Sequence, residues 1–372
     1  MAEVAKSRTP HPDLPPPASA VGVLGWVRRN LFSSPLNIAL TLLAAYLLYA
    51  MIPSVLRWTL FDATWRGDSR EACAANRGAC WVFIRIHFEQ FMYGFYPDAQ
   101  RWRVNSAALL LILSAAPLFV RAVPGSVKLR LGLSILAIYP IIAFVLFRGG
   151  LFGLPEVETR QWGGLLLTLV IAGVGMAAAL PLGVLLALGR RSKMPAIQTL
   201  CVTFIEFWRG VPLITVLFMS SVMLPLFLPA GVSFDKLLRA LIGVTLFQAA
   251  YMAEVVRGGL QAIPKGQFEA AAALGLSYWK TMALIVLPQA LKLVIPGIVN
   301  TFIALFKDTS LVLIIGLFDL MNIVHNATTN PAWLGFSTEG YVFAAAVYWL
   351  FCFSMSRYSQ SLEKRLHTGH KR

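Results

Sequence analysis

The chain has 372 residues, of which 58% are hydrophobic and 13% are charged, and its mean hydropathy is +0.69. Soluble domains carry about 25% charged residues, so this composition excludes an ordinary soluble protein and makes the bilayer the solvent. The net charge of +15 does not indicate a nucleic-acid-binding protein, because the Lys and Arg residues sit in short connections between apolar segments.

The first 35 residues, with the proline-rich stretch PHPDLPPP, are expected to form a disordered tail. They do not resemble a signal peptide, because the first apolar run begins too late and is too long. Several later runs are long enough to cross about 30 Å of hydrocarbon. They predict an all-α polytopic membrane protein with about eight transmembrane helices, at approximately 36–56, 104–121, 131–147, 163–189, 204–228, 238–257, 285–306 and 341–357.

Basic residues are more numerous in the connections that lie on the same side of the membrane as the amino terminus. Most of those on the other side lie in one long loop, at about 58–103, where the positive-inside rule is weak. Both termini, including a tail at 363–372, are therefore expected in the cytoplasm. Part of the long loop is expected to lie along the membrane surface as an amphipathic segment that contains Trp81, Arg85, Phe88, Glu89 and Phe91.

The four cysteines fall into two pairs. Cys201 and Cys352 lie in predicted membrane helices, where buried thiols are common. Cys73 and Cys80 lie in the outer loop, where an oxidising compartment favours a small disulfide ring, with two unpaired thiols as the alternative. No His or Cys cluster has the spacing of metal ligands, so we expect no metal.

From Trp162 onward, five predicted spans are joined by short loops. Gly175, Ala179 and Gly183 recur at four-residue spacing and predict a close approach of another helix. Pro288 and Pro296 bracket the start of a later span, where they either kink a cavity wall or shape packing. No internal repeat is visible, which disfavours inverted-repeat secondary transporters.

The connection 269–288 reads EAAAALGLSYWKTMALIVLP. Four alanines predict a slim helix, Gly275 is suited to end it in a left-handed conformation, and Ser277 is suited to cap the next helix. Glu269, expected on the first turn, is placed to favour the helix dipole and to reach a basic group on a partner. A solvated capping carboxylate is the alternative.

No phosphate-binding loop of the form GxxxxGK followed by Ser or Thr is present, and no nucleophile–base pair is visible. We therefore expect that the chain is not an enzyme and binds no cofactor itself. Any energy for its work would come through a partner.

The 269–288 stretch resembles the EAA loop of ABC importer permeases. Residues 162–362 resemble the five-helix core of the type I (MetI-like) permease domain, and three stretches within it resemble the polar amino-acid uptake branch: FIEFWRGVPLITVLF at 204–218, AEVVRGGLQAIPKGQFEAAAALGLS at 253–277 and NTFIALFKDTSLVLIIGLFDL at 300–320. The amino-terminal helices at 36–150 and FRGGLFGLPEVETRQWGGLLLTL at 147–169 resemble the M-type membrane subunit of bacterial general L-amino-acid transporters.

This resemblance implies a permease subunit of an ATP-driven L-amino-acid importer in the bacterial inner membrane. A second, similar permease subunit would complete the translocation path, most simply as a heterodimer. A separate ATPase dimer would bind ATP and magnesium, and a periplasmic amino-acid-binding protein would deliver substrate. The residues implied in coupling to the ATPase are Glu269, Ala270, Ala271, Gly275, Ile285, Leu287 and Pro288.

The candidates for contact with substrate are polar residues at membrane level, because intramembrane ionisable groups are usually functional: Asn300, Lys307, Asp308, Thr309 and Ser310. A mutual ion pair between Lys307 and Asp308 is the alternative. Glu206, Arg209 and Glu254 are expected to make subunit contacts or salt bridges instead. A secondary transporter or channel is the alternative function, but the helix centres are almost free of carboxylates and His.

Overall fold

The computed structural model describes residues 22–74, 77–120, 122–227, 229 and 234–366. The predicted tails at 1–35 and 363–372 therefore lie partly outside the described residues. The chain divides into two compact units, Met1–Val82 and Phe83–Arg372, which are described separately.

Among the described residues of the first unit, α1 (Gly22–Asn30) is followed by α2 (Pro35–Leu56), and α2 continues as a π-helical turn, Arg57–Phe61. The expectation of disorder up to residue 35 was wrong for α1, whose last turn carries Arg28 and Arg29, where positive charge favours the helix dipole. Ser34 caps α2 by accepting the Asn37 backbone N–H at 3.2 Å. In the following loop Cys73 and Cys80 form a disulfide, with their Cα atoms 5.7 Å apart.

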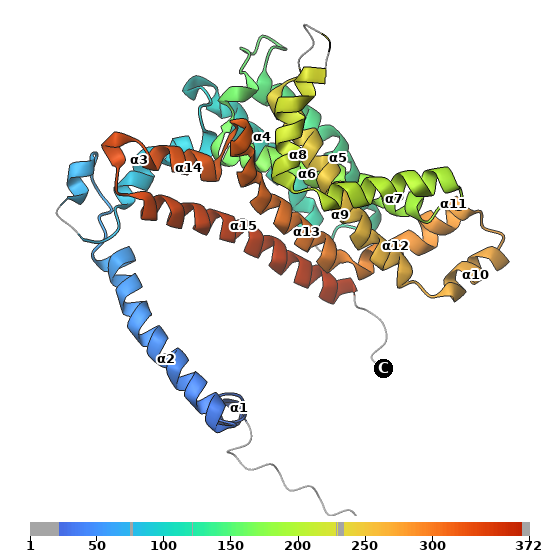
Figure 1. Ribbon diagram of the computed structural model, residues 1–372, viewed down its shortest axis with the longest axis horizontal. Coiled ribbons are helices and arrows are strands. Elements are labelled where there is room, and N and C mark those ends of the chain that lie inside the picture. The colour runs from blue at the N-terminus through green and yellow to red at the C-terminus, as the bar shows by residue number, and fades with distance from the viewer. Residues whose placement is uncertain (1–21, 75–76, 121, 228, 230–233, 367–372) are drawn as a thin grey trace, which may run out of the picture. The chain divides into compact units, whose positions relative to one another are not determined.

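The second unit is also helical (Figure 1). The segment expected at the membrane surface forms α3, which begins at the end of the first unit. The elements in chain order are α3 (Trp81–Tyr93), α4 (Arg101–Phe119), α5 (Gly125–Arg148), α6 (Gly164–Arg190), α7 (Pro195–Gly210), α8 (Leu213–Phe218), α9 (Lys236–Gln261), α10 (Lys265–Ala273), α11 (Tyr278–Thr281), α12 (Leu287–Leu293), α13 (Ile295–Asp308), β1 (Phe318–Asp319), α14 (Leu320–Thr328) and α15 (Ser337–Leu366). Short π or 3-10 turns link several of them: η4 (Asp98–Gln100), η5 (Thr159–Gln161), η6 (Met219–Met223), η7 (Leu224–Phe227), η8 (Met282–Val286), η9 (Thr309–Ile315) and η10 (Pro331–Trp333).

The fold is an α-helical polytopic membrane protein, as predicted, but fewer than eight stretches of the described residues have the length and hydropathy of a span. Within the described residues, six helical stretches are long and apolar enough to cross a membrane, or seven if the bent α7–α8 pair counts as one span. The predicted eighth segment, 341–357, lies in α15, which is 30 residues long but does not reach the hydropathy of the other six. Its polar and aromatic residues lower its mean hydropathy.

The expected single helix at 204–228 is broken. α7 ends at Gly210, α8 begins at Leu213, and the two segments meet at 103°. Pro212 has no backbone N–H to donate and disfavours helical geometry at the preceding residue, and Val211 is accordingly extended, with φ −102° and ψ 133°. Pro288 and Pro296 each stand in the first turn of a helix, α12 and α13, where a missing N–H is tolerated.

The core of the second unit is the contact between α6 and α9. A Cβ atom built on Gly183 would lie 2.6 Å from the Cβ atom of Met252, and one on Gly175 would lie 3.4 Å from a methyl group of Val244. The α9 partner lies the same number of positions further along the chain in both pairs, so the two helices run parallel. Ala179, between the two glycines, is fully buried. The stripe of small residues thus provides the predicted close approach.

We expect the substitution Gly183→Ala to destabilise the fold, because the added methyl group has no room beside Met252. Overpacking of this kind costs about 1–3 kcal/mol. Gly173 is a matched control on the same helix, since a Cβ atom there meets nothing within 4 Å. Gly173→Ala should be neutral or slightly stabilising, because alanine is a better helix former. Thermal unfolding of the purified protein in detergent would measure both, and equal shifts in Tm would contradict the packing argument.

Candidate functional site

The helix α10 ends in a Schellman motif. The Leu276 N–H donates to the Ala271 carbonyl at 3.1 Å, the Gly275 N–H donates to the Ala272 carbonyl at 2.9 Å, and Gly275 has φ +70°. A Cβ atom on Gly275 would meet nothing within 4 Å, so glycine is required there for its conformation rather than for space. The chain therefore turns sharply after α10, as the sequence predicted.

The four alanines of α10 are not equivalent. Ala271 is 1% exposed and packs inward, whereas Ala270, Ala272 and Ala273 face outward with Glu269. Glu269 lies on the second turn, since α10 begins at Lys265, so its expected position on the first turn was wrong. Three large side chains on either side of the bend are also exposed: Leu274, Tyr278 and Trp279. Together these residues form a slim, exposed helix that is followed by an exposed apolar surface at the bend.

The predicted positions after the bend have different environments. Ile285 lies in the π-helical turn η8, Leu287 packs on a buried cluster that includes Met252, and Pro288 is exposed. Ser277 occupies the cap position of α11, but its hydroxyl makes no capping hydrogen bond. Gln289 donates to the Ile285 carbonyl at 2.9 Å and to the Gln267 side chain at 3.1 Å, which connects α12 to α10.

Arg191, just after α6, fixes α10 to the end of the helix pair. Its guanidinium donates to the Leu260 carbonyl of α9 at 2.9 Å and lies over the Phe268 ring of α10 at 5.7 Å. Phe268 also packs on the buried cluster at this end, which includes residues of α6, α7 and α9. These contacts therefore connect α10 directly to the ends of α6 and α9.

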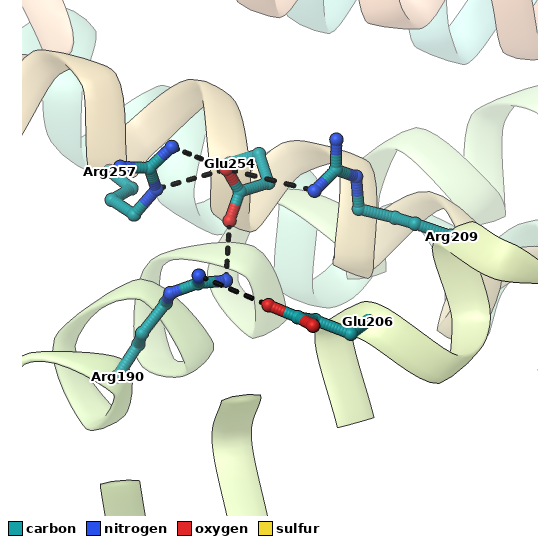
Figure 2. Close-up of polar contacts among 5 residues, drawn as sticks. All are labelled: Arg190, Glu206, Arg209, Glu254 and Arg257. Carbon is teal, nitrogen blue, oxygen red and sulfur yellow. Dashed lines mark hydrogen bonds and ion pairs between the residues drawn. The ribbon is translucent and has the colours of Figure 1, made fainter. Parts of the chain in front are cut away.

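Five charged residues form a network at the same end of the helices, which we call the Glu254 cluster: Arg190, Glu206, Arg209, Glu254 and Arg257 (Figure 2). Glu254 Oε1 lies 2.8 Å from Arg190 Nη1, and Glu254 Oε2 lies 2.7 Å from Arg257 Nη2 and 3.7 Å from Arg209 Nη1. Arg190 Nη2 also lies 3.3 Å from Glu206 Oε1.

The Glu254 cluster joins α6, α7 and α9 through one carboxylate. The Glu254 side chain is only 16% exposed, and three guanidinium groups surround it. Ion pairs of Glu206, Arg209 and Glu254 were expected from the sequence. Their partners Arg190 and Arg257 were recognised only as charges that orient the topology, because pairing across three helices has no local signal.

A second polar network lies at the opposite end of α6, and the sequence did not reveal it. Asp319 is fully buried and accepts hydrogen bonds from the Tyr348 hydroxyl at 2.8 Å and from the Asn322 side chain at 2.5 Å. The Leu320 N–H donates to the Thr168 hydroxyl at 3.0 Å. Burial raises the pKa of the Asp319 carboxyl, while the hydrogen bonds from Tyr348 and Asn322 lower it. The one available signal was an aspartate before a short amphipathic helix, since Asp319 also caps α14.

The residues predicted to contact substrate lie in α13 and at the start of η9. Asn300 and Lys307 are exposed, Asp308 is half-buried, and no ion pair joins Lys307 to Asp308 among the described residues. Thr309 is buried and donates to the Phe306 carbonyl at 2.9 Å, and Ser310 donates to the Lys307 carbonyl at 2.9 Å. Both hydroxyls therefore donate hydrogen bonds to backbone carbonyl groups at the end of α13.

Residues 179–368 match the protein family described as "Binding-protein-dependent transport system inner membrane component". The "Inner membrane amino-acid ABC transporter permease protein YhdY" of Escherichia coli is 62% identical over 96% of this chain and 97% of its own length. The "Glutamate/glutamine/aspartate/asparagine transport system permease protein BztC" of Rhodobacter capsulatus is 42% identical over 96% of both chains. The "Probable glutamine ABC transporter permease protein GlnP" of Bacillus subtilis is 35% identical over 55% of this chain and 92% of its own.

We expect Glu254→Gln to destabilise the protein by about 3 kcal/mol, because it leaves three arginines around a largely buried position without their carboxylate. Glu206→Gln is the matched control, since the Glu206 side chain is 61% exposed and makes one contact at 3.3 Å. An exposed pair of that kind contributes at most about 1 kcal/mol. Thermal unfolding in detergent would measure both variants, and a larger effect at Glu206 would contradict the assignment.

We expect Tyr348→Phe to lower the free energy of unfolding by about 1–3 kcal/mol, because buried Asp319 loses a hydrogen-bond donor. Tyr341→Phe is the control, since its hydroxyl contacts His325 at an exposed position. Because the pKa of Asp319 is raised in the folded protein, ionisation of this carboxyl disfavours folding. The free energy of unfolding should therefore fall as pH rises above about 3.9, the ordinary aspartate pKa. Tyr348→Phe should steepen this fall and Asp319→Asn should flatten it in thermal unfolding scans between pH 4 and 8, and unchanged slopes in both would contradict the expectation.

Proposed function

The chain belongs to the family of binding-protein-dependent transport system inner membrane components, and from this premise we propose that it is the permease subunit of an ATP-driven importer of L-amino acids. Two relatives that match 96% of the chain carry amino-acid permease names, which supports an amino-acid substrate. The reported relatives are named as permeases of transport systems, so we do not retain the secondary-transporter or channel alternative.

The observation that carries the proposal is the construction of α10. This helix projects with Glu269 exposed, turns at Gly275, and is held by Arg191 and Phe268 against the ends of α6 and α9. A partner that grips the exposed face would pull on both core helices at once. We propose that this partner is the ATPase and that α10 couples ATPase closure to helix movement.

The work is divided among several chains. The ATPase would bind ATP and magnesium, and a periplasmic protein would deliver the amino acid. An ATPase dimer offers two equivalent contact sites, whereas this chain supplies one α10. We therefore propose a second permease subunit of similar fold and different sequence, which completes the translocation path. Our candidates for contact with substrate in that path remain Asn300, Lys307, Asp308, Thr309 and Ser310.

We propose that α10 and the Glu254 cluster face the cytoplasm of a bacterial inner-membrane protein. Basic residues concentrate at this end, with Arg190 and Arg191 at the end of α6, and Lys265 and Lys280 beside the bend. The starts of α6 and α9 and the buried Asp319 then lie toward the periplasm. With α15 crossing the membrane as an eighth span, as the sequence predicts for 341–357, this orientation also places both termini in the cytoplasm.

We expect Gly275→Ala to impair ATP-driven uptake while leaving membrane insertion intact. An L-residue in the left-handed region costs about 1–2 kcal/mol, which would loosen the bend after α10. Gly266 is a matched control in α10, because a Cβ atom on it also meets nothing within 4 Å, but its φ is not positive. Gly266→Ala should transport normally.

The measurement is uptake of radiolabelled L-amino acids into proteoliposomes that contain the complete transporter, with ATP hydrolysis recorded in parallel. A weakened bend should lower the number of amino acids imported per ATP hydrolysed. Uptake that persists without any ATPase subunit would refute the proposed function. Equal impairment of the two glycine variants would refute the role of the bend.

A further inference from the structure

A polar cavity of about 500 Å³ lies at the end of the second unit opposite α10. Its walls come from the segment between α5 and α6, from the first residues of α9 and from the turn after η9. Six of the residues that line it are charged: Arg148, Glu156, Glu158, Arg160, Asp235 and Lys236. Its volume falls within the range of about 300–1,000 Å³ that is usual for small-molecule sites.

Most of these charges are already paired with one another. Arg148 Nη2 lies 3.1 Å from Glu156 Oε1, and Arg160 forms an ion pair with Glu158. Asp235 caps α9 by accepting the Leu238 N–H at 3.1 Å. Its other oxygen accepts the Thr159 hydroxyl at 2.5 Å.

Lys236 is the exception among the charged residues of the cavity. Within the described residues it has no ion-pair partner, and its ammonium lies beside the turn at Gly316, where a Cβ atom would be 3.6 Å away. Gly316 has φ +69°, so the turn itself requires glycine. The cavity therefore holds one ammonium group without an ion-pair partner among the described residues, next to carboxylates that keep unused acceptor positions.

The wall 148–160 is fixed from outside the family-matched region. Arg103 of α4 is fully buried and donates to the Pro155 carbonyl at 2.9 Å, and the Val157 N–H donates to the Arg148 carbonyl at 2.7 Å. These bonds hold the segment in place before any ligand arrives. A site that is ordered in advance loses less free energy when it binds a ligand.

We propose that this cavity is a vestibule site for an α-amino acid, in which Lys236 binds the substrate carboxylate and the carboxylates of Glu158 and Asp235 accept the substrate ammonium. An α-amino acid carries one group of each sign a few ångströms apart, which matches a free cation beside available acceptors. The inference rests on the proposed function, because it assumes that the amino acid arrives at this end of the helices.

The test uses the complete transporter in lipid nanodiscs, without the binding protein, and measures equilibrium binding of each of the twenty radiolabelled L-amino acids. We expect at least one to bind, and Lys236→Gln to weaken that binding about tenfold through loss of a charge-assisted hydrogen bond. Lys236→Arg should bind like the wild type. Lys364→Gln, which removes an exposed lysine of α15, is the charge-matched control. The decarboxylated amine of the bound amino acid should bind wild type and Lys236→Gln equally weakly.

ATP- and binding-protein-dependent uptake is measured on the same preparations. Uptake by the wild type without direct binding of any amino acid, or with binding unchanged in Lys236→Gln, would overturn the vestibule site while the proposed function stands. If Lys236→Gln lowers uptake but not direct binding, Lys236 contacts the binding protein instead, and the proposal is wrong. Absence of ATP-driven uptake of every amino acid would overturn the proposed function itself.

Discussion

The close parallel contact of α6 with α9 is the constraint on which the rest of the structure depends. Gly183 lies against Met252, so the two backbones approach more closely than a side chain at position 183 would allow. Because the helices are parallel, the carboxyl ends of both lie at one end of the pair and the amino ends of both lie at the other. The ends of α6 and α9 meet α10 and the Glu254 cluster, and their starts lie near the buried Asp319 and the polar cavity. A bundle fixed along its length can transmit a displacement from one end to the other as a rigid body.

Two kinds of contact join the helices at the α10 end. The Glu254 cluster joins three helices through charge-assisted contacts around a carboxylate that is 16% exposed. The contact of Arg191 with Phe268 and the bond between Gln289 and Gln267 are fewer and more exposed. α10 is thus joined to these helices by fewer polar contacts, together with the buried Ala271 and the packing of Phe268. If α10 binds a partner, as proposed above, these contacts connect the bound surface to α6 and α9.

The sequence predicted those features that have a local signal. Helical spans follow from apolar length, the bend after α10 follows from Gly275, and the α6–α9 contact follows from small residues at four-residue spacing. The break between α7 and α8 also had a local signal in Pro212, but the apolar run on both sides masked it. In contrast, Asp319 and Tyr348 are distant in the chain, and nothing near either residue predicts the other. The same holds for Arg190 and Glu254, whose pairing exists only because the helices are parallel and in register.

The helices that precede the family-matched region shape the second unit as well as adding membrane spans. Arg103 of α4 reaches the segment before α6, although two of its nitrogen atoms, Nε and Nη2, have no hydrogen-bond partner among the described residues. Burying a guanidinium with unsatisfied N–H groups is costly. The same side chain fixes the Pro155 carbonyl and so the wall of the polar cavity. Arg103 therefore holds the segment before α6 in place at the expense of two unsatisfied N–H groups.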